Sequence, residues 1–287
     1  MATSESRERW RCAVLGSPIA HSLSPVLHLA AYRELDLPWD YSAYDVTQEQ
    51  LPDFVAGLTD EWLGLSLTMP LKRAVIPLCD RVESRGRLLG SINTVVFDQL
   101  GRAGYNTDVP GFVRALAAHG VRELDEVVVL GAGATAASAL AAVAESGGDR
   151  VTVYARSATR ARELERLAEP LGLRLEVKEL AELRSAGLTD VVVNAGTADV
   201  VVSTIPAEAQ APYAPALTGL GGVLFDVIYD PPVTPFVGAA RAAGLAVIPA
   251  FDLLLHQAAR QVELLTGVRH APLEAMRAAG LAKLASR

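Results

Sequence analysis

The sequence of 287 residues has little cysteine, no excess of positive charge and no long apolar run. Two cysteines, Cys12 and Cys79, without a C-x-x-C pair exclude a disulfide scaffold, so we expect buried thiols in a reducing compartment. Neither they nor the scattered histidines have the spacing of metal ligands, and we expect no metal. The net charge of -7 argues against nucleic acid or an anionic membrane as the main partner.

The amino-terminal segment MATSESRERW is polar and charged, unlike a secretory signal. Residues 127–144 carry no charge and approach the length of a membrane span. That stretch is rich in alanine and interrupted by Gly131 and Gly133, which favours a strand, a turn and a helix instead. We therefore expect a cytoplasmic protein with a small-molecule ligand and no membrane partner. The sequence does not fix the oligomeric state, and a homodimer is one option.

The part of the chain before residue 120 alternates strands and helices without a glycine-rich fingerprint. The predicted strands are 12–15, 39–46, 64–68, 91–98 and 102–105, and the predicted helices are 25–35, 48–57, 70–79 and 110–119. This pattern predicts an α/β domain.

From residue 127 the order strand, helix, strand is typical of right-handed parallel units. The predicted strands are 127–130, 151–155, 173–177, 199–203, 223–227 and 246–248, and the predicted helices are 134–144, 159–168, 236–243 and 252–266. Two near-duplicates, DVVVNAGT from residue 190 and DVVVSTIP from residue 199, compete for one strand. We favour the second, because it ends at a proline-containing turn that can face a ligand.

A G-x-G-x-x-A loop follows the strand 127–130 and opens the next helix. Gly131 suits a tight turn, Gly133 lets the backbone approach a pyrophosphate, and Ala136 permits close packing of helix and strand. The loop consists of Gly131, Ala132, Gly133, Ala134, Thr135 and Ala136. The free amides of the helix N-terminus complete an anion site. The alternative is a glycine-rich turn without a ligand.

The end of the second strand of this unit indicates which dinucleotide binds. An NAD site usually places an acidic residue there, about twenty residues after the loop. The sequence VTVYARSATR has none and offers Arg156, Ser157 and Arg160. Two guanidinium groups and a hydroxyl suit a 2′-phosphate, and cations near a helix N-terminus need an external anion. We predict NADP, with two merely solvated arginines as the alternative.

Uncharged polar residues lie beside the predicted turns of the first half. They are Ser22, Ser24, Ser66, Thr68, Asn93, Thr94, Asn106 and Thr107. Lys72 stands at the start of a predicted helix, where the dipole gains nothing from a cation. Asp108 could simply cap the helix that begins at Pro110. Spacing alone leaves a catalytic Lys72–Asp108 pair as one option among others.

The segment HSLSP contains two serines with different expected roles. Ser24 precedes Pro25 and fits the N-cap of the following helix. Ser22 lies outside that position, so capping does not explain it and we expect it to contact a ligand.

Several segments together resemble the shikimate dehydrogenase family. They are HSLSP, GLSLTMPLK, GSINTVV, YNTDVPGF, GAGATAASAL, ARSATRA, FDVIYDPPVTPF and LLLHQAARQVELLTG, and they follow the family's order from residue 14 to about 267. The resemblance implies a reversible, NADPH-dependent reduction of 3-dehydroshikimate to shikimate, a step of aromatic amino-acid biosynthesis. It implies an α/β substrate-binding domain over 1–109 and 252–287, and a doubly wound Rossmann domain for NADP over 110–251. The C-terminal helix would return to the first domain.

The resemblance also implies roles for individual residues. The implied substrate ligands are Ser22 and Ser24 for the carboxylate with Tyr229 nearby, and Thr68, Asn93, Asp108 and Gln257 for the ring hydroxyls. Lys72 and Asp108 would form the catalytic pair, in which Lys72 stabilises the negative charge that develops on the ketone oxygen. The implied cofactor ligands are Gly131, Ala132, Gly133, Ala134, Thr135, Arg156, Ser157 and Arg160, with Val227 and Ala250 beside the nicotinamide.

The sequence departs from the family's pattern at several positions. Ser66 and Ala155 each stand where the family usually has Asn, Ala250 where it has Gly, and Leu253 where it has Met. Ser66 would reshape one substrate hydrogen bond, and Ala250 would disturb the nicotinamide if the backbone there needs a positive φ. The alternatives are a quinate/shikimate or aminoshikimate dehydrogenase and, more remotely, a non-catalytic NADP-binding sensor.

Overall fold

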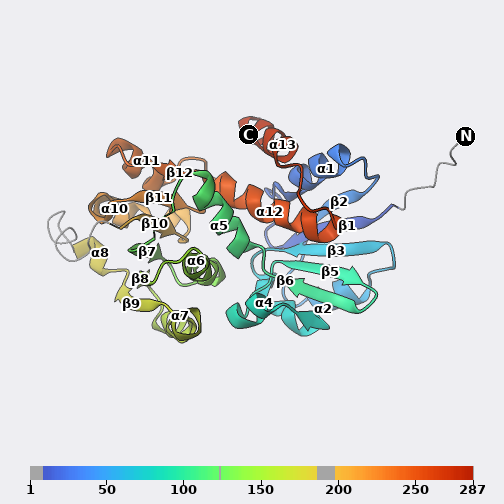
Figure 1. Cartoon of the computed structure of the whole chain (residues 1–287), viewed down its shortest axis with the longest axis horizontal. Coiled ribbons are helices and arrows are strands. Elements are labelled where there is room, and N and C mark those ends of the chain that lie inside the picture. Colours follow the sequence, from blue (N-terminus) through green and yellow to red (C-terminus); the bar gives the residue numbers. More distant parts are fainter. Residues whose placement is uncertain (1–8, 123, 186–197, 287) are drawn as a thin grey trace, which may run out of the picture. The chain divides into compact units, whose positions relative to one another are not determined.

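The computed structural model describes residues 9–122, 124–185 and 198–286. The chain forms two compact units, Met1–Thr107 with Leu255–Arg287, and Asp108–Leu254 (Figure 1). The chain passes from one unit to the other between Thr107 and Asp108 and returns inside a single helix. The boundaries predicted after residues 109 and 251 fall within three residues of these divisions.

The first unit contains a six-stranded mixed sheet with the order β2-β1-β3-β5-β6-β4. β1, β2 and β3 are parallel, β5 is antiparallel to both β3 and β6, and β4 pairs parallel with β6. The strands are β1 (Arg11–Gly16), β2 (Asp40–Asp45), β3 (Trp62–Leu67), β4 (Arg81–Val82), β5 (Thr94–Asp98) and β6 (Gly101–Tyr105).

Helices cover both faces of this sheet. Successive residues of β1 point to opposite sides, and both sets of side chains are apolar and buried. The helical segments are α1 (Ser24–Glu34), α2 (Leu51–Ala56), α3 (Leu71–Ala74), the 3₁₀ turn η1 (Ile76–Leu78), α4 (Ser84–Leu89), α12 (Ala250–Thr266) and α13 (Leu273–Ala285). Leu15 packs with α2 and α3, whereas Cys12 packs with Tyr32 of α1 and Leu265 of α12. A Cβ at Gly64 would collide with Leu265 of α12 and with the Val95 carbonyl oxygen of β5, so this position of β3 requires glycine.

The second unit contains a fully parallel sheet with the order β12-β11-β10-β7-β8-β9. The strands are β7 (Val127–Leu130), β8 (Arg150–Ala155), β9 (Arg174–Glu179), β10 (Val200–Ser203), β11 (Val223–Asp226) and β12 (Val247–Ile248). The chain winds outward from β7 to β9 and then continues from the other side of β7. This is the doubly wound order in which the winding reverses between β7 and β10. The strand predicted at 199–203 is confirmed, and its rival at 190–194 lies outside the described residues.

Helices flank the second sheet on both sides (Figure 1). They are α5 (Asp108–Ala118), α6 (Ala134–Glu145), α7 (Ala158–Leu171), α8 (Glu182–Ser185), the 3₁₀ turns η2 (Ala207–Ala209) and η3 (Ala211–Tyr213), α10 (Ala214–Leu220) and α11 (Pro235–Ala242). Val128 and Leu130 pack on the side of α10 and α11. α6 and α7 lie against β7, β8 and β9, so the predicted Rossmann architecture is confirmed.

Some predicted elements differ from the structure. The helix expected over 70–79 is divided into α3 and η1, because Pro77 has no N–H to continue the helical ladder. The sequence interpretation missed β4, α4, α8, α10 and α13. Within the described ranges, no helix is both long and apolar enough to cross a membrane.

Candidate active site

The polar residues of the first unit gather where the parallel strands β1 and β3 end. Ser22 and Ser24 follow β1, and Thr68 and Lys72 follow β3. The Thr68 amide donates to the Leu15 carbonyl at 2.9 Å, which joins the two loops. The Lys72 carbonyl accepts from the Ile92 amide at 2.9 Å and so holds the segment before Asn93 beside α3. Ligands of open α/β sheets bind at such carboxyl ends.

The two serines of HSLSP have other local roles than expected. The predicted N-cap at Ser24 is wrong: the N-cap is Leu23, whose carbonyl accepts from the Leu27 amide at 3.1 Å, and Ser24 is the first helical residue. The Ser22 hydroxyl accepts from the Ser24 amide at 3.3 Å, so Ser22, although it lies outside the N-cap position, has a local role at the start of the helix. Its own O–H proton remains a donor. A contact of Ser22 with a substrate carboxylate stays a prediction.

Asn93 and Gln257 are brought together by a buried hydrogen-bond network. Asn93 Oδ1 accepts from the Thr107 amide at 2.8 Å, from Thr107 Oγ1 at 3.1 Å and from Thr94 Oγ1 at 3.0 Å. Asn93 Nδ2 donates to Gln257 Oε1 at 3.3 Å. Thr107 directly precedes Asp108, so the same network anchors the residue next to the predicted acid.

Sequence reasoning missed Tyr41 and Gln261 and gave Ser66 no structural role. The Tyr41 hydroxyl donates to Ser66 Oγ at 2.7 Å, and Ser66 Oγ donates to Gln261 Oε1 at 3.0 Å. One available signal was the spacing of Gln257 and Gln261. Residues four apart share one face of a helix.

The two glycines of the cofactor loop are required for different reasons. Gly131 has φ +111°, and a Cβ there would collide with Thr204 Oγ1. Thr204 is held in place because its amide and hydroxyl donate to the Leu130 carbonyl at 2.8 and 2.9 Å. Gly133, the N-cap of α6, has no described atom within 4 Å of the place where a Cβ would lie. The fold thus needs glycine at 131, whereas at 133 the space in front of the helix suits a ligand.

The residues predicted to bind the 2′-phosphate lie at the end of β8. Arg156 follows the strand, and Ser157 is the N-cap of α7, where its Oγ accepts from the Arg160 amide at 3.4 Å. Both arginine side chains are exposed, and among the described residues neither guanidinium forms an ion pair. Ala155 is buried in the strand. An external anion is therefore compatible with both arginines.

A second buried network holds the loop that contains Val227 and Tyr229. Asp226 Oδ2 accepts from Gln210 Nε2 at 2.9 Å and from Thr234 Oγ1 at 2.6 Å. Burial raises the pKa of this carboxyl, although its hydrogen bonds favour the charged form. The network fixes both ends of the loop and so positions Val227 and Tyr229.

The concern about Ala250 does not apply to the structure. Ala250 is the first residue of α12, and among the described non-glycine residues only Asp36 has a positive φ. Leu253 is buried in the same helix.

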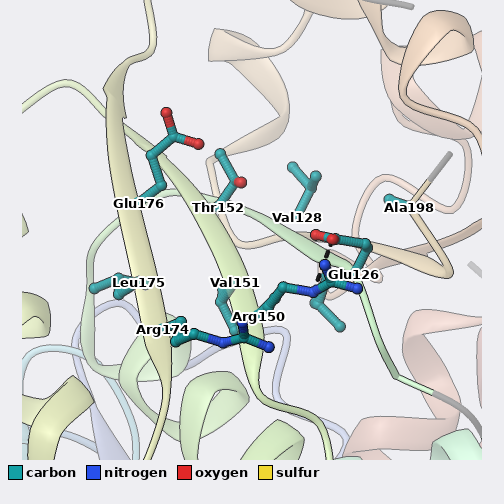
Figure 2. A pocket seen from close by; sticks show the side chains of 10 residues that line it. Glu126, Val128, Arg150, Val151, Thr152, Arg174, Leu175, Glu176 and Ala198 are labelled. Atoms are coloured by element: carbon teal, nitrogen blue, oxygen red, sulfur yellow. Dashed lines mark ion pairs between the residues drawn. The ribbon is translucent and has the colours of Figure 1, made fainter. Parts of the chain in front are cut away.

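A cavity of about 450 Å³ opens at the amino ends of β7, β8 and β9 (Figure 2). Arg150 in its wall pairs with Glu126 at 2.8 Å, as the dashed line in Figure 2 shows. Rossmann ligands bind at the opposite, carboxyl ends of the strands, so we do not assign this cavity to the cofactor. Within the described ranges no cluster of three or more His, Cys, Asp or Glu side chains could hold a metal ion.

Comparisons with known proteins cover most of the chain. Residues 14–95 match the family model "Shikimate dehydrogenase substrate binding domain", residues 115–246 match "Shikimate / quinate 5-dehydrogenase", and residues 251–279 match "Shikimate 5'-dehydrogenase C-terminal domain". A shikimate dehydrogenase (NADP(+)) of Methanopyrus kandleri is 36% identical over 94% of each chain.

Solved structures agree with these matches. A shikimate 5-dehydrogenase from Mycobacterium fortuitum is 45% identical, with a TM-score of 0.81 over 94% of this chain and 97% of that one. The enzyme from Thermus thermophilus, in complex with NADP(H) and shikimate, is 32% identical, with a TM-score of 0.77 over 95% and 99% of the two chains. The chain therefore belongs to the shikimate dehydrogenase family.

Proposed function

We propose that the protein is an NADP-dependent oxidoreductase that reversibly reduces 3-dehydroshikimate to shikimate. The observation that carries this proposal is that a chain of this family has both a set of substrate-binding candidates and a dinucleotide-binding loop. The first unit holds Lys72 beside the Asn93–Gln257 network, and the second holds a glycine loop followed by arginines.

The cofactor residues fit NADP. The open space at Gly133 lies at the N-terminus of α6, where unpaired amides attract a pyrophosphate. Arg156 and Arg160 would bind the 2′-phosphate. When bound, NADPH supplies the hydride.

The residues of the first unit supply binding and proton transfer in this proposal. Lys72 donates a proton to the oxygen that becomes the hydroxyl, and Asp108 keeps that ammonium charged and oriented. The hydroxyls of Ser22 and Ser24 donate to the substrate carboxylate, with Tyr229 nearby.

The ring of the substrate requires neutral hydrogen-bonding partners. Thr68, Asn93 and Gln257 provide them, and a small polyhydroxylated acid is the class of molecule that such a set suits. Local hydroxyl donors also explain how a chain with a net charge of -7 could hold an anionic substrate.

The test is oxidation of shikimate by the purified protein with NADP⁺, followed through NADPH absorbance. Lys72→Ala should lower kcat by about two to four orders of magnitude while shikimate still binds. Arg73→Ala, which removes the same charge from the neighbouring residue, is the matched control and should stay close to the wild-type kcat. Full activity of Lys72→Ala would refute the assigned role.

Substrate preference is measured in the same assay. We expect a higher kcat/KM for shikimate with NADP⁺ than for quinate with NAD⁺. A tenfold preference for quinate and NAD⁺ would instead favour the quinate-type enzyme.

A further inference from the structure

A line of buried polar side chains runs from β2 to α12 in the first unit. Tyr41, Ser66 and Gln261 are 4%, 3% and 2% exposed. Gln261 Nε2 lies 3.1 Å from the Asn93 carbonyl oxygen and 3.1 Å from Thr94 Oγ1. Together with the Tyr41–Ser66 and Ser66–Gln261 bonds, these contacts connect Tyr41 to the Asn93–Gln257 pair.

The direction of each hydrogen bond is determined by a backbone group that can act only as an acceptor or only as a donor. The Asn93 backbone carbonyl can only accept, so Gln261 faces it with nitrogen and turns its oxygen toward Ser66. Ser66 must therefore donate to Gln261 and accept from Tyr41. Burial raises the pKa of the Tyr41 phenol, which keeps its proton. Since the single Ser66 proton is used within this line, Ser66 has none to donate to a substrate.

The second half of the line is equally determined. Thr94 Oγ1 accepts from Gln261, so its own proton goes to Asn93 Oδ1. The backbone N–H of Thr107 can only donate, and it points at the same oxygen. The Asn93 nitrogen is thereby directed to Gln257 Oε1, and Gln257 turns its own nitrogen away from Asn93.

We propose that Tyr41, Ser66 and Gln261 are positioning residues that, together with the Thr107 amide, set the amide orientations of Asn93 and Gln257. The inference rests on the proposed function, in which those two amides bind ring hydroxyls. In this orientation Gln257 offers N–H donors to the substrate. The group that it binds must accept, so a hydroxyl or keto oxygen is favoured over an ammonium group, which has only donors.

Two variants test the line without touching a residue proposed to bind the substrate. Gln261→Leu keeps a side chain of similar size but has no amide, so the Asn93 carbonyl oxygen and Thr94 Oγ1 lose their donor. Thr94 is then no longer constrained to donate to Asn93 Oδ1. We expect the KM for shikimate to rise about tenfold with kcat within about threefold, since orientation affects ground-state and transition-state binding alike. Tyr41→Phe keeps the ring and removes one donor, and should raise the KM about threefold.

Three comparisons separate positioning from simple loss of stability. The KM for NADP⁺ should stay within about twofold of the wild-type value in both variants. Leu265→Ala, one turn further along α12 and buried against Cys12, should lower the Tm without changing the KM for shikimate. The double variant of Tyr41→Phe and Gln261→Leu should match Gln261→Leu alone, because both act through one line.

Binding of an amino analogue of shikimate gives the specificity readout. Wild type should bind shikimate more tightly than the analogue, and Gln261→Leu should reduce that ratio. If Gln261→Leu does not fold, Tyr41→Phe decides. If the wild type oxidises shikimate but the folded variants keep a KM for shikimate within twofold of its value, this inference is overturned and the proposed function stands. A wild type that does not oxidise shikimate overturns the proposed function and the inference with it.

Discussion

Lowering the pH should destabilise the first unit through the buried imidazole of His28. The ring is 0% exposed, its Nδ1 lies 2.9 Å from the Ser24 carbonyl oxygen, and it stacks on Tyr41 with centroids 4.0 Å apart. Because that carbonyl can only accept, Nδ1 carries the proton, and Nε2 has no hydrogen-bond partner among the described residues. Burial lowers the pKa of His28 from 6.5 to about 4, and the bond to Ser24 opposes this shift only in part.

The sign and size of the effect follow from this shift. The unfolded chain takes up a proton near pH 6.5, whereas the native ring stays neutral until about pH 4. The stability contributed by the neutral ring is therefore complete above the unfolded pKa and is lost as the pH falls toward the folded pKa. A shift of about 2.5 pKa units corresponds to about 3 kcal/mol in total, of which about 2 kcal/mol is lost between about pH 7 and pH 5.

Urea unfolding followed by tryptophan fluorescence reports the stability of the first unit, to which His28 belongs. The three tryptophans of the sequence, Trp10, Trp39 and Trp62, all belong to the first unit. His28→Phe keeps a flat ring for Tyr41 but cannot titrate. Between about pH 7 and pH 5 the wild type should lose about 2 kcal/mol more than this variant, because carboxylate titration is common to both proteins. Equal losses would refute the neutral buried state of His28.

Three further substitutions test the cofactor unit. Gly131→Ala should destabilise the second unit by about 1–3 kcal/mol, since φ is +111° and the new methyl would meet Thr204; an unchanged Tm would contradict this. Gly133→Ala should lower the Tm less than Gly131→Ala, since only an N-cap preference is lost, and should raise the KM for NADP⁺ about tenfold, because its methyl enters only the ligand's space; an unchanged KM would argue against a pyrophosphate there. Arg156→Ala should raise the KM for NADP⁺ about tenfold or more and that for NAD⁺ less than twofold, and equal changes would exclude the phosphate role.

The second unit could be predicted from the sequence because its signals are local. The run Val127–Leu130, the glycine loop and the alanine-rich helix are contiguous, and each determines its own structure. The reason for Gly131 was still incomplete, since its neighbour Thr204 comes from the end of β10, beyond the reach of any local pattern.

The error at Ser24 has a comparable origin. Residue preferences place serine before a proline at the N-cap. The structure begins the helix one residue earlier, because the Leu23 carbonyl already accepts from Leu27 and the Ser22 hydroxyl takes the Ser24 amide. A cap is defined by which carbonyl accepts the first bond, and composition alone does not decide that.

The residues that orient the site were the hardest to find, and the reason is physical. Substrate-binding candidates stand beside turns, where a polar residue without a local role attracts attention. Ser66 and Gln261 lie inside a strand and a helix and are separated by 195 residues, so their roles exist only once packing brings them together. A buried polar side chain costs free energy unless it is bonded, so such a line persists only with every donor matched. It follows that replacing one member without its neighbours should disturb the orientation of Asn93 before it disturbs the fold.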